Sequence, residues 1–174
     1  EIHSFVSNSL IRLMNTEKNR DQHFIERAIE LSKKGMDSGK GGPFGCIVVK
    51  GDEIIGEGSN EVTSSNDPTA HAEVVAIRNA CEKLGTYQLT DCEIYTSCEP
   101  CPMCLGAIYW SRPKRVVYAN TKEEAAAIDF DDDYIYKEIY AKMSDRNIPF
   151  IHYPHTKAVE VFEAWKNWEG KIKY

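Results

Sequence analysis

Residues 71–73 read His-Ala-Glu and residues 98–104 read Cys-Glu-Pro-Cys-Pro-Met-Cys, and these two stretches decide which fold the chain needs. Zinc in proteins takes nitrogen and thiolate ligands in tetrahedral geometry, and three protein ligands leave a fourth position for water. His71, Cys101 and Cys104 form such a set. The spacing therefore predicts a catalytic zinc site that holds one ion per chain.

Glu73 is a polar residue near the expected zinc ligands that is not itself needed as a ligand. It stands two positions after His71, so on a helix the two side chains do not share a face as ligands. A carboxylate placed there can exchange protons with a water at the metal, as a general acid and base. We therefore interpret Glu73 as catalytic.

A closed structural site is the alternative. Cys98, Cys101 and Cys104 are evenly spaced, and with His71 they could form a Cys3His site in which Glu73 is only a solvated helix residue. That alternative leaves the His-Ala-Glu triplet and Pro102 unexplained. In the catalytic interpretation, Cys98 ends the preceding strand as a small buried residue.

The composition indicates one cytoplasmic domain. The chain has 174 residues, a net charge of −6 and no run of the roughly 20 apolar residues that a membrane span requires. Its N-terminus does not resemble a signal peptide, and its six cysteines are expected to be reduced. The acidic balance disfavours a nucleic-acid partner. The basic run at 112–115 fits either a phosphate contact or a solvated turn before a strand.

Strands alternate with helices along the chain, which predicts a layered α/β domain with helices on both faces of a sheet. Residues 1–20 are expected to form an extension outside the core, and residues 21–174 the domain itself. Asp67 and Pro68 predict the start of the helix that carries His71. The expected strands are 46–50, 53–57, 92–96 and 116–119, and the expected helices begin near 21, 67, 103, 123 and 134, with a last one around 159–168.

These motifs resemble the cytidine deaminase-like superfamily, on residues 66–73 and 98–104. More closely, the chain resembles bacterial guanine deaminases in four further features: Gly41-Gly42-Pro43-Phe44-Gly45, the run 95–113, Phe130-Asp131-Asp132, and the terminal Tyr174. The resemblance covers about residues 21–174. It implies a three-layer αβα sandwich around a mixed five-stranded sheet, and hydrolysis of guanine to xanthine and ammonia.

The resemblance also implies roles for single residues. Asn60 and Asp132 would hydrogen-bond the purine, and Phe44 and Trp110 would form apolar walls. Tyr174 would be a C-terminal lid. Apart from the resemblance, the backbone N–H groups of Ala72 and Cys101 stand at expected helix starts, where they would fix the base or stabilise charge. Similar enzymes are homodimers, and some exchange C-terminal segments between subunits.

Residue chemistry alone leaves two of these roles open. An ionised aspartate accepts the ring N–H groups of guanine, but the acidic cluster around Asp132 is equally typical of a solvated loop. Asn60 offers a donor and an acceptor to a purine edge, yet asparagine after Gly58-Ser59 is also a common turn residue. The aromatic stripe of the last helix fits a core or a subunit interface.

Rival functions also stay open at this point. They are deamination of guanosine, cytosine or tRNA adenosine, and a catalytically silent zinc-binding protein. Glu73 argues against the silent protein. The acidic balance and the lack of a basic C-terminal tail argue against tRNA.

Overall fold

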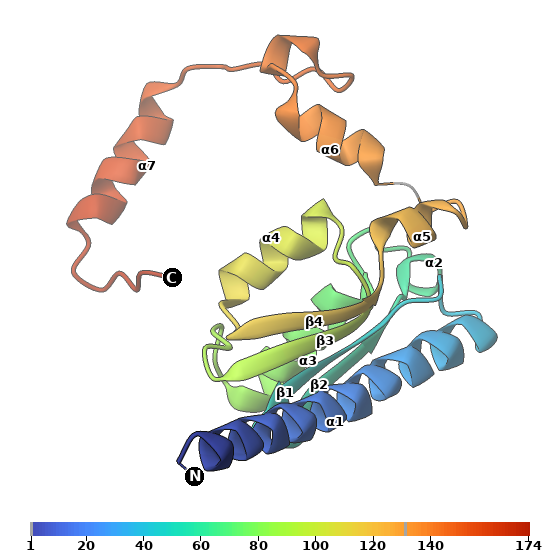
Figure 1. Cartoon of the computed structure of the whole chain (residues 1–174). Helices are drawn as coiled ribbons and strands as arrows, with labels where there is room; N and C mark the ends of the chain where they lie inside the picture. The colour runs from blue at the N-terminus through green and yellow to red at the C-terminus, as the bar shows by residue number, and fades with distance from the viewer. Residues whose placement is uncertain (1, 131) are drawn as a thin grey trace. The chain divides into compact units, whose positions relative to one another are not determined.

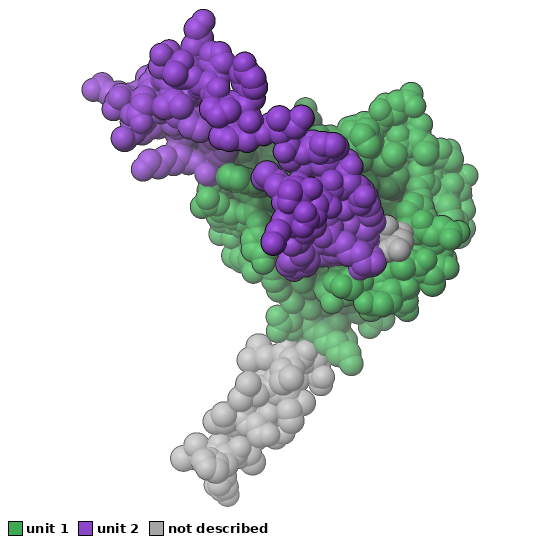
Figure 2. All heavy atoms as spheres, turned by 90° about the horizontal axis from the view of Figure 1, so that it is seen from above, with its two compact units in different colours: residues 1–132 green, residues 133–174 purple. Residues whose placement is uncertain are grey.

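The computed structural model describes residues 2–130 and 132–174, with side chains from residue 17 onward within these ranges. The chain divides into two compact units, residues 1–132 and 133–174 (Figure 2). The boundary expected between residues 20 and 21 falls inside one continuous helix, α1. No helix of the described residues combines the length and the apolar character that crossing a membrane requires.

The first unit holds the sheet and most of the helices. Its elements are α1 (Ile2–Asp37), β1 (Gly45–Lys50), β2 (Glu53–Ser59), α2 (Val62–Ser65), α3 (Ala72–Leu84), β3 (Cys92–Cys98), α4 (Pro102–Ser111), β4 (Arg115–Asn120) and α5 (Lys122–Ala126). The second unit contains α6 (Asp133–Tyr140), the short 3-10 helix η1 (Met143–Asp145) and α7 (Thr156–Asn167).

The sheet is mixed and has the strand order β2-β1-β3-β4. β1 runs antiparallel to β2 and β3, whereas β3 and β4 are parallel. α1 covers one face of the sheet, and α3 and α4 cover the other (Figure 1). The expected three-layer αβα sandwich is therefore confirmed.

The expectation of five strands is wrong, because the described residues form four. Directly after β4, the Thr121 side chain accepts a hydrogen bond from the backbone N–H of Glu124, and the Glu124 carboxylate accepts one from the N–H of Thr121. This capping box begins helix α5 directly after β4. The later regular elements of the described chain are also helical.

Two apolar cores lie on the two faces of the sheet, because side chains along a strand alternate between its faces. On β1, Ile47 and Val49 pack with Phe24 of α1, whereas Cys46 and Val48 pack with α3 and α4. A strand that is apolar at every position is typical of a sheet covered on both sides. The metal-binding segments lie on the α3 and α4 side.

Glycines in β2 let α3 lie close to the sheet. A Cβ atom at Gly58 would clash with the carbonyl oxygen of Ala72, and one at Gly56 would clash with that of Ala76. Only glycine leaves room for such an approach. The first turn of α3, which carries Glu73, is therefore held against the sheet.

A polar cluster on the α1 side ties that helix to the sheet. The Glu93 Oε2 atom accepts hydrogen bonds from Arg20 (2.9 Å) and Arg115 (3.0 Å), and the Asp21 carboxylate accepts one from Arg115 (2.6 Å). The Tyr95 hydroxyl lies 2.8 Å from the Glu93 Oε2 atom and 2.7 Å from the Asp21 Oδ1 atom, so the two carboxylates share its single hydrogen. Burial alone would raise the pKa of Glu93, but these hydrogen bonds outweigh it and the pKa is lowered.

We expect Glu93→Gln to lower the free energy of unfolding at pH 7 by about 1–3 kcal/mol, the range for hydrogen bonds to a charged group. A carboxyl with a lowered folded-state pKa stabilises the fold above its unfolded pKa, about 4.3, and loses that contribution as pH falls through the folded value. The difference from wild type should therefore shrink below about pH 4. Denaturant titrations at equal zinc saturation measure it.

Glu53→Gln is the matched control for this cluster. Glu53, like Glu93, pairs with a basic side chain, here Lys83, but its carboxylate is largely exposed. A screened surface pair contributes little to stability. Equal effects of the two substitutions at pH 7, or a Glu93→Gln effect that does not change with pH, would contradict the assignment.

Candidate zinc and catalytic site

Two of the three expected metal ligands stand at helix N-termini. His71 is the N-cap residue of α3, and Cys101 is the N-cap residue of α4, with Pro102 at its first position. The predicted helix start at Asp67 is wrong, because the Asp67 Oδ1 atom accepts hydrogen bonds from the backbone and side chain of Thr69 and closes a turn. The helix begins only at Ala72.

His71, Cys101 and Cys104 come together, with their ligand atoms all within 4.8 Å of one another. The Nδ1 atom of His71 lies 3.5 Å from each of the two sulfurs. Nitrogen and sulfur ligands of a tetrahedral zinc ion, at about 2.0 and 2.3 Å from the metal, lie about 3.5 Å apart. The three side chains therefore fit a zinc ion.

The thiols of Cys101 and Cys104 have shifted pKa values. A hydrogen bond from Cys104 lowers the pKa of Cys101 to about 4, and the same bond raises the pKa of Cys104. Hydrogen bonding with Cys101 also raises the pKa of His71. Zinc would take both sulfurs as thiolates, so its affinity for this site would depend on pH.

Glu73 lies in the first turn of α3 and is 6% exposed. Its Oε2 atom is 3.3 Å from the Cys104 sulfur, and its Oε1 atom accepts a hydrogen bond from the Thr96 hydroxyl at 3.2 Å. Burial raises the pKa of this carboxyl. A buried carboxyl beside three metal ligands is typical of a catalytic acid and base.

Cys98 stands apart from the ligand set. Its sulfur is 3.7 Å from the carbonyl oxygen of Thr121, and burial raises its pKa to about 11. The metal-binding group found among the described residues contains His71, Cys101 and Cys104 and does not include Cys98. This arrangement favours the three-ligand site over the closed Cys3His alternative.

Asn60 is buried beside the loop that leads into β1. Its Oδ1 atom accepts hydrogen bonds from the backbone N–H groups of Gly42 (3.3 Å) and Val62 (3.2 Å), and its backbone N–H donates to the carbonyl oxygen of Phe44 (3.0 Å). The two bonds to Oδ1 fix the orientation of the side-chain amide. The group left to meet a ligand is the NH2 donor.

Phe44 and Asp132 lie in segments that approach the site. The ring of Phe44 packs edge-on against Phe130, with 4.9 Å between ring centroids. Asp132 is partly buried, and its charge is among the causes that raise the pKa of Cys98, after burial and Glu73. The other acidic residue of the resemblance, Asp131, lies outside the described residues.

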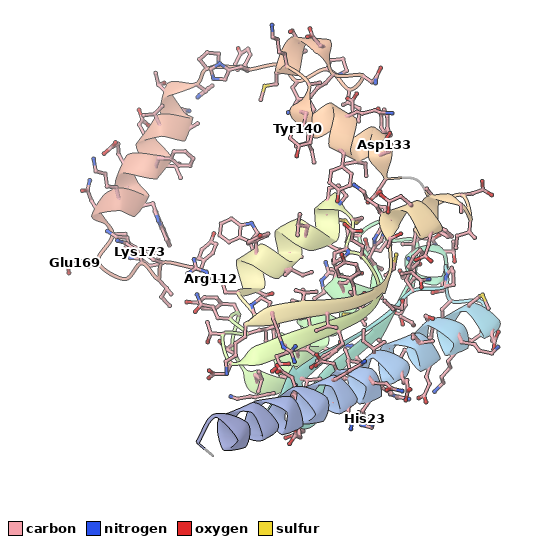
Figure 3. The ribbon with its side chains drawn as sticks, viewed as in Figure 1. His23, Arg112, Asp133, Tyr140, Glu169 and Lys173 are labelled. Carbon is pink, nitrogen blue, oxygen red and sulfur yellow. The ribbon has the colours of Figure 1, made fainter. Side chains whose placement is uncertain are left out.

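The last three residues expected to contact the substrate are Ala72, Trp110 and Tyr174, and they differ in burial and in the element that carries them. Ala72 is fully buried at the first position of α3, where its backbone N–H has no partner within the helix. Trp110 is 63% exposed and lies at the other end of α4 from the ligands, two residues before the C-cap residue Arg112, which Figure 3 labels. Tyr174 belongs to the second unit and is 68% exposed.

Three residues near the site were not among those expected. Thr96 bonds Glu73, the Ser97 hydroxyl accepts a hydrogen bond from the backbone N–H of Gly45 (3.0 Å), and Phe130 contacts Phe44. The available signal was alternation along β3, which puts polar Thr96 on the same face as Ile94. Its partner on α3 could not be read from that alternation.

Comparison with known proteins identifies the class. The profile of the cytidine and deoxycytidylate deaminase zinc-binding region matches residues 18–120. The chain belongs to this family of zinc-dependent deaminases.

Particular relatives are closer than the family as a whole. The guanine deaminase of Bacillus subtilis (strain 168) is 56% identical over 151 residues, which are 87% of this chain and 97% of that protein. An X-ray structure of guanine deaminase from Bacillus subtilis has a TM-score of 0.86, is 56% identical, and covers 88% of this chain and 98% of its own. The crystal structure of a protein named NE0047 in complex with 2,6-diaminopurine is 34% identical and has a TM-score of 0.62. The match covers 64% of this chain and 62% of that protein's chain.

Proposed function

We propose that this chain catalyses the hydrolytic deamination of guanine to xanthine and ammonia. The observation that carries the proposal is the buried Glu73 carboxylate beside His71, Cys101 and Cys104. The guanine deaminase of Bacillus subtilis, which matches along nearly its whole length, supports guanine as the substrate. We assign the catalytic domain to residues 21–174, with residues 1–20 as an extension.

His71, Cys101 and Cys104 would hold the zinc ion, which supplies a Lewis acid that activates water for attack. Glu73 accepts the proton of the attacking water and passes it to a ring nitrogen next to C2. Glu73 then takes the second proton of that water from the hydroxyl group now bound to C2 and delivers it to the amino group, which leaves as ammonia. Its burial keeps competing water from these transfers.

In this proposal, both hydrogen-bonding groups and an aromatic ring hold the purine. Asn60 donates from its NH2 group to an acceptor on the base, because its Oδ1 atom is already bonded to the backbone. Asp132 accepts a ring N–H. The Phe44 ring, supported by Phe130, packs on the base. The backbone N–H of Ala72, on the first turn of α3, is a further donor.

The second unit supports a homodimer with exchanged C-terminal segments. None of the residues of α7 is buried, so its aromatic stripe is not part of a core within the second unit. The side chains of Tyr140, Ile151 and Phe162 are 86%, 86% and 79% exposed. Apolar surface on this scale marks an interaction site. In the dimer, Trp110 serves as a wall of the pocket and Tyr174 as its lid.

The protein is proposed to act in the cytoplasm, on a small purine and without a nucleic-acid partner. Its six cysteines are free thiols, as is typical of a reducing compartment. The excess of 27 acidic over 21 basic residues disfavours polyanion binding.

We expect Asp132→Asn to weaken guanine binding by about 1.5–3 kcal/mol, since a neutral amide replaces a charged acceptor of similar shape. Calorimetry in a Glu73→Gln background measures binding without turnover. Asp129→Asn is the control, because Asp129 lies in the same acidic loop and is exposed. Equal affinities of the Asp132→Asn and control proteins would assign the purine contact to another group.

Removal of residues 171–174 is expected to lower guanine turnover at least about tenfold, because Tyr174 would no longer exclude water from the pocket. Zinc content and melting temperature should change little, since exposed terminal residues contribute few core contacts. Steady-state kinetics and metal analysis test this. Tyr174→Phe, which keeps the ring, should retain most turnover, and wild-type kinetics in the truncated protein would show that the tail is no lid.

The substrate is tested by ultraviolet-monitored deamination of guanine, guanosine, adenine, cytosine and ammeline by the zinc-loaded protein. We expect guanine to give the highest kcat/KM of the five. A clear preference for another compound would replace guanine as the substrate, and no turnover of any would favour a catalytically silent zinc protein.

A further inference from the structure

Thr96 is a buried polar residue on the strand between the two cores. On β3, Tyr95 packs toward α1, whereas Ile94 belongs to the core on the α3 and α4 side. Thr96 shares the face of Ile94 by the alternation of a strand, and its side chain is 1% exposed. Its neighbour across the antiparallel pair is the fully buried Cys46. The hydroxyl of Thr96 thus lies in mainly apolar surroundings.

A hydroxyl in such surroundings needs a hydrogen-bond partner. Thr96 Oγ1 donates to the Oε1 atom of Glu73 at 3.2 Å, and both groups are buried. The other carboxylate oxygen, Oε2, lies 3.3 Å from the sulfur of Cys104. The two oxygens of Glu73 therefore face different partners: Oε1 faces the sheet, and Oε2 faces the metal ligands.

We propose that Thr96 is a positioning residue, which holds the Glu73 carboxylate so that Oε2 is the oxygen that transfers protons. This inference rests on the proposed function and deepens it. The terminal torsion of a glutamate side chain has a broad energy profile, so packing alone does not fix the plane of its carboxylate. A donor on Oε1 fixes that plane. A general base must also lie within hydrogen-bond reach of the proton that it abstracts, and a rotated carboxylate loses that reach.

The competing explanation is that the Thr96 hydroxyl contributes only to folding. That explanation predicts a lower melting temperature and an unchanged kcat when the hydroxyl is removed. The positioning role predicts a lower kcat with an unchanged KM, because the proton transfers change while the contacts to the purine stay. A serine at position 96 keeps the hydroxyl and should preserve function.

The test compares guanine kinetics of Thr96→Val, Thr96→Ser and the wild-type protein, with turnover expressed per bound zinc so that unfolded protein does not enter kcat. Thr96→Val should lower kcat by about 10- to 100-fold, the effect of losing one hydrogen bond to a charged group. Its KM should stay within about twofold, and Thr96→Ser should keep kcat within about threefold.

Ser111→Ala is the matched control, since the Ser111 hydroxyl is also buried but donates to the carbonyl oxygen of Ile108 at 3.0 Å. Its kcat should equal that of wild type. Wild-type kcat in Thr96→Val would overturn the positioning role, as would equal losses in Thr96→Val and Thr96→Ser, or in Thr96→Val and Ser111→Ala. Inactivity of the wild-type protein on guanine would instead overturn the proposed function, so the two failures are distinguishable.

Discussion

Glu73→Gln should lower kcat on guanine by at least about 10²-fold, the usual contribution of a general acid and base, while zinc stays near one ion per chain. The amide keeps the size of the side chain and its acceptor for Thr96, but it cannot take up a proton. Because Glu73 is not one of the three grouped metal ligands, its neutralisation should leave the metal bound. Steady-state kinetics and metal analysis on the same sample measure both effects.

The control for this variant lies on the same helix. Glu82 is exposed on α3, and Glu82→Gln removes the same charge without touching the site. Its kcat should match the wild-type value. If Glu73→Gln retained wild-type kcat, or lost its zinc, the assignment of Glu73 as the proton-transferring residue would have to be abandoned.

Removal of a metal ligand should have the larger effect. We expect His71→Ala, Cys101→Ala and Cys104→Ala each to lose most of the zinc and to lose measurable turnover, because two ligands do not hold the ion in a tetrahedral site. Loss of the metal should also lower the melting temperature, since binding to the folded state contributes to stability. Metal analysis after gel filtration checks all three.

Cys98→Ala separates the catalytic site from the structural alternative. The Cys98 sulfur faces the carbonyl of Thr121, so this variant should keep about one zinc per chain and most of its turnover. Loss of zinc in Cys98→Ala, with zinc retained in Cys104→Ala, would favour a different ligand set.

The sequence was most informative where chemistry requires particular residues at fixed spacing. His71, Glu73, Cys101 and Cys104 could be predicted because few arrangements other than a zinc site use this pattern. The β1–β2 hairpin was also predictable, since Gly51-Asp52 separates two β-branched runs. The hairpin depends on contacts between residues close in sequence, and the ligand motif depends on the geometry that a metal ion requires.

Local signals failed where two interactions compete for the same residue. Asp67 is a good N-cap residue, but its side chain accepts a hydrogen bond from the backbone N–H of Thr69 in a local turn. The helix starts five residues after Asp67, at Ala72. The helix after β4 was predicted to begin near residue 123, whereas the capping box at Thr121 that starts it one residue earlier was not predicted.

Contacts between distant segments could not be read from the pattern. Thr96 and Glu73 are 23 residues apart, and Tyr95 and Asp21 are 74 residues apart. Such pairs depend on the packing of helices against the sheet, which residue types alone do not specify. The exposed aromatic residues of α7 are a further case, because the explanation proposed for them is a second copy of the chain.

Deamination of guanine in water labelled with heavy oxygen tests the central claim most directly. If this site hydrolyses guanine at C2, mass spectrometry should find one heavy oxygen atom in each xanthine formed, with one ammonia released per xanthine and at least about 10²-fold slower product formation by the Glu73→Gln protein. Xanthine without the label, ammonia out of proportion to xanthine, or equal product from Glu73→Gln would contradict the account.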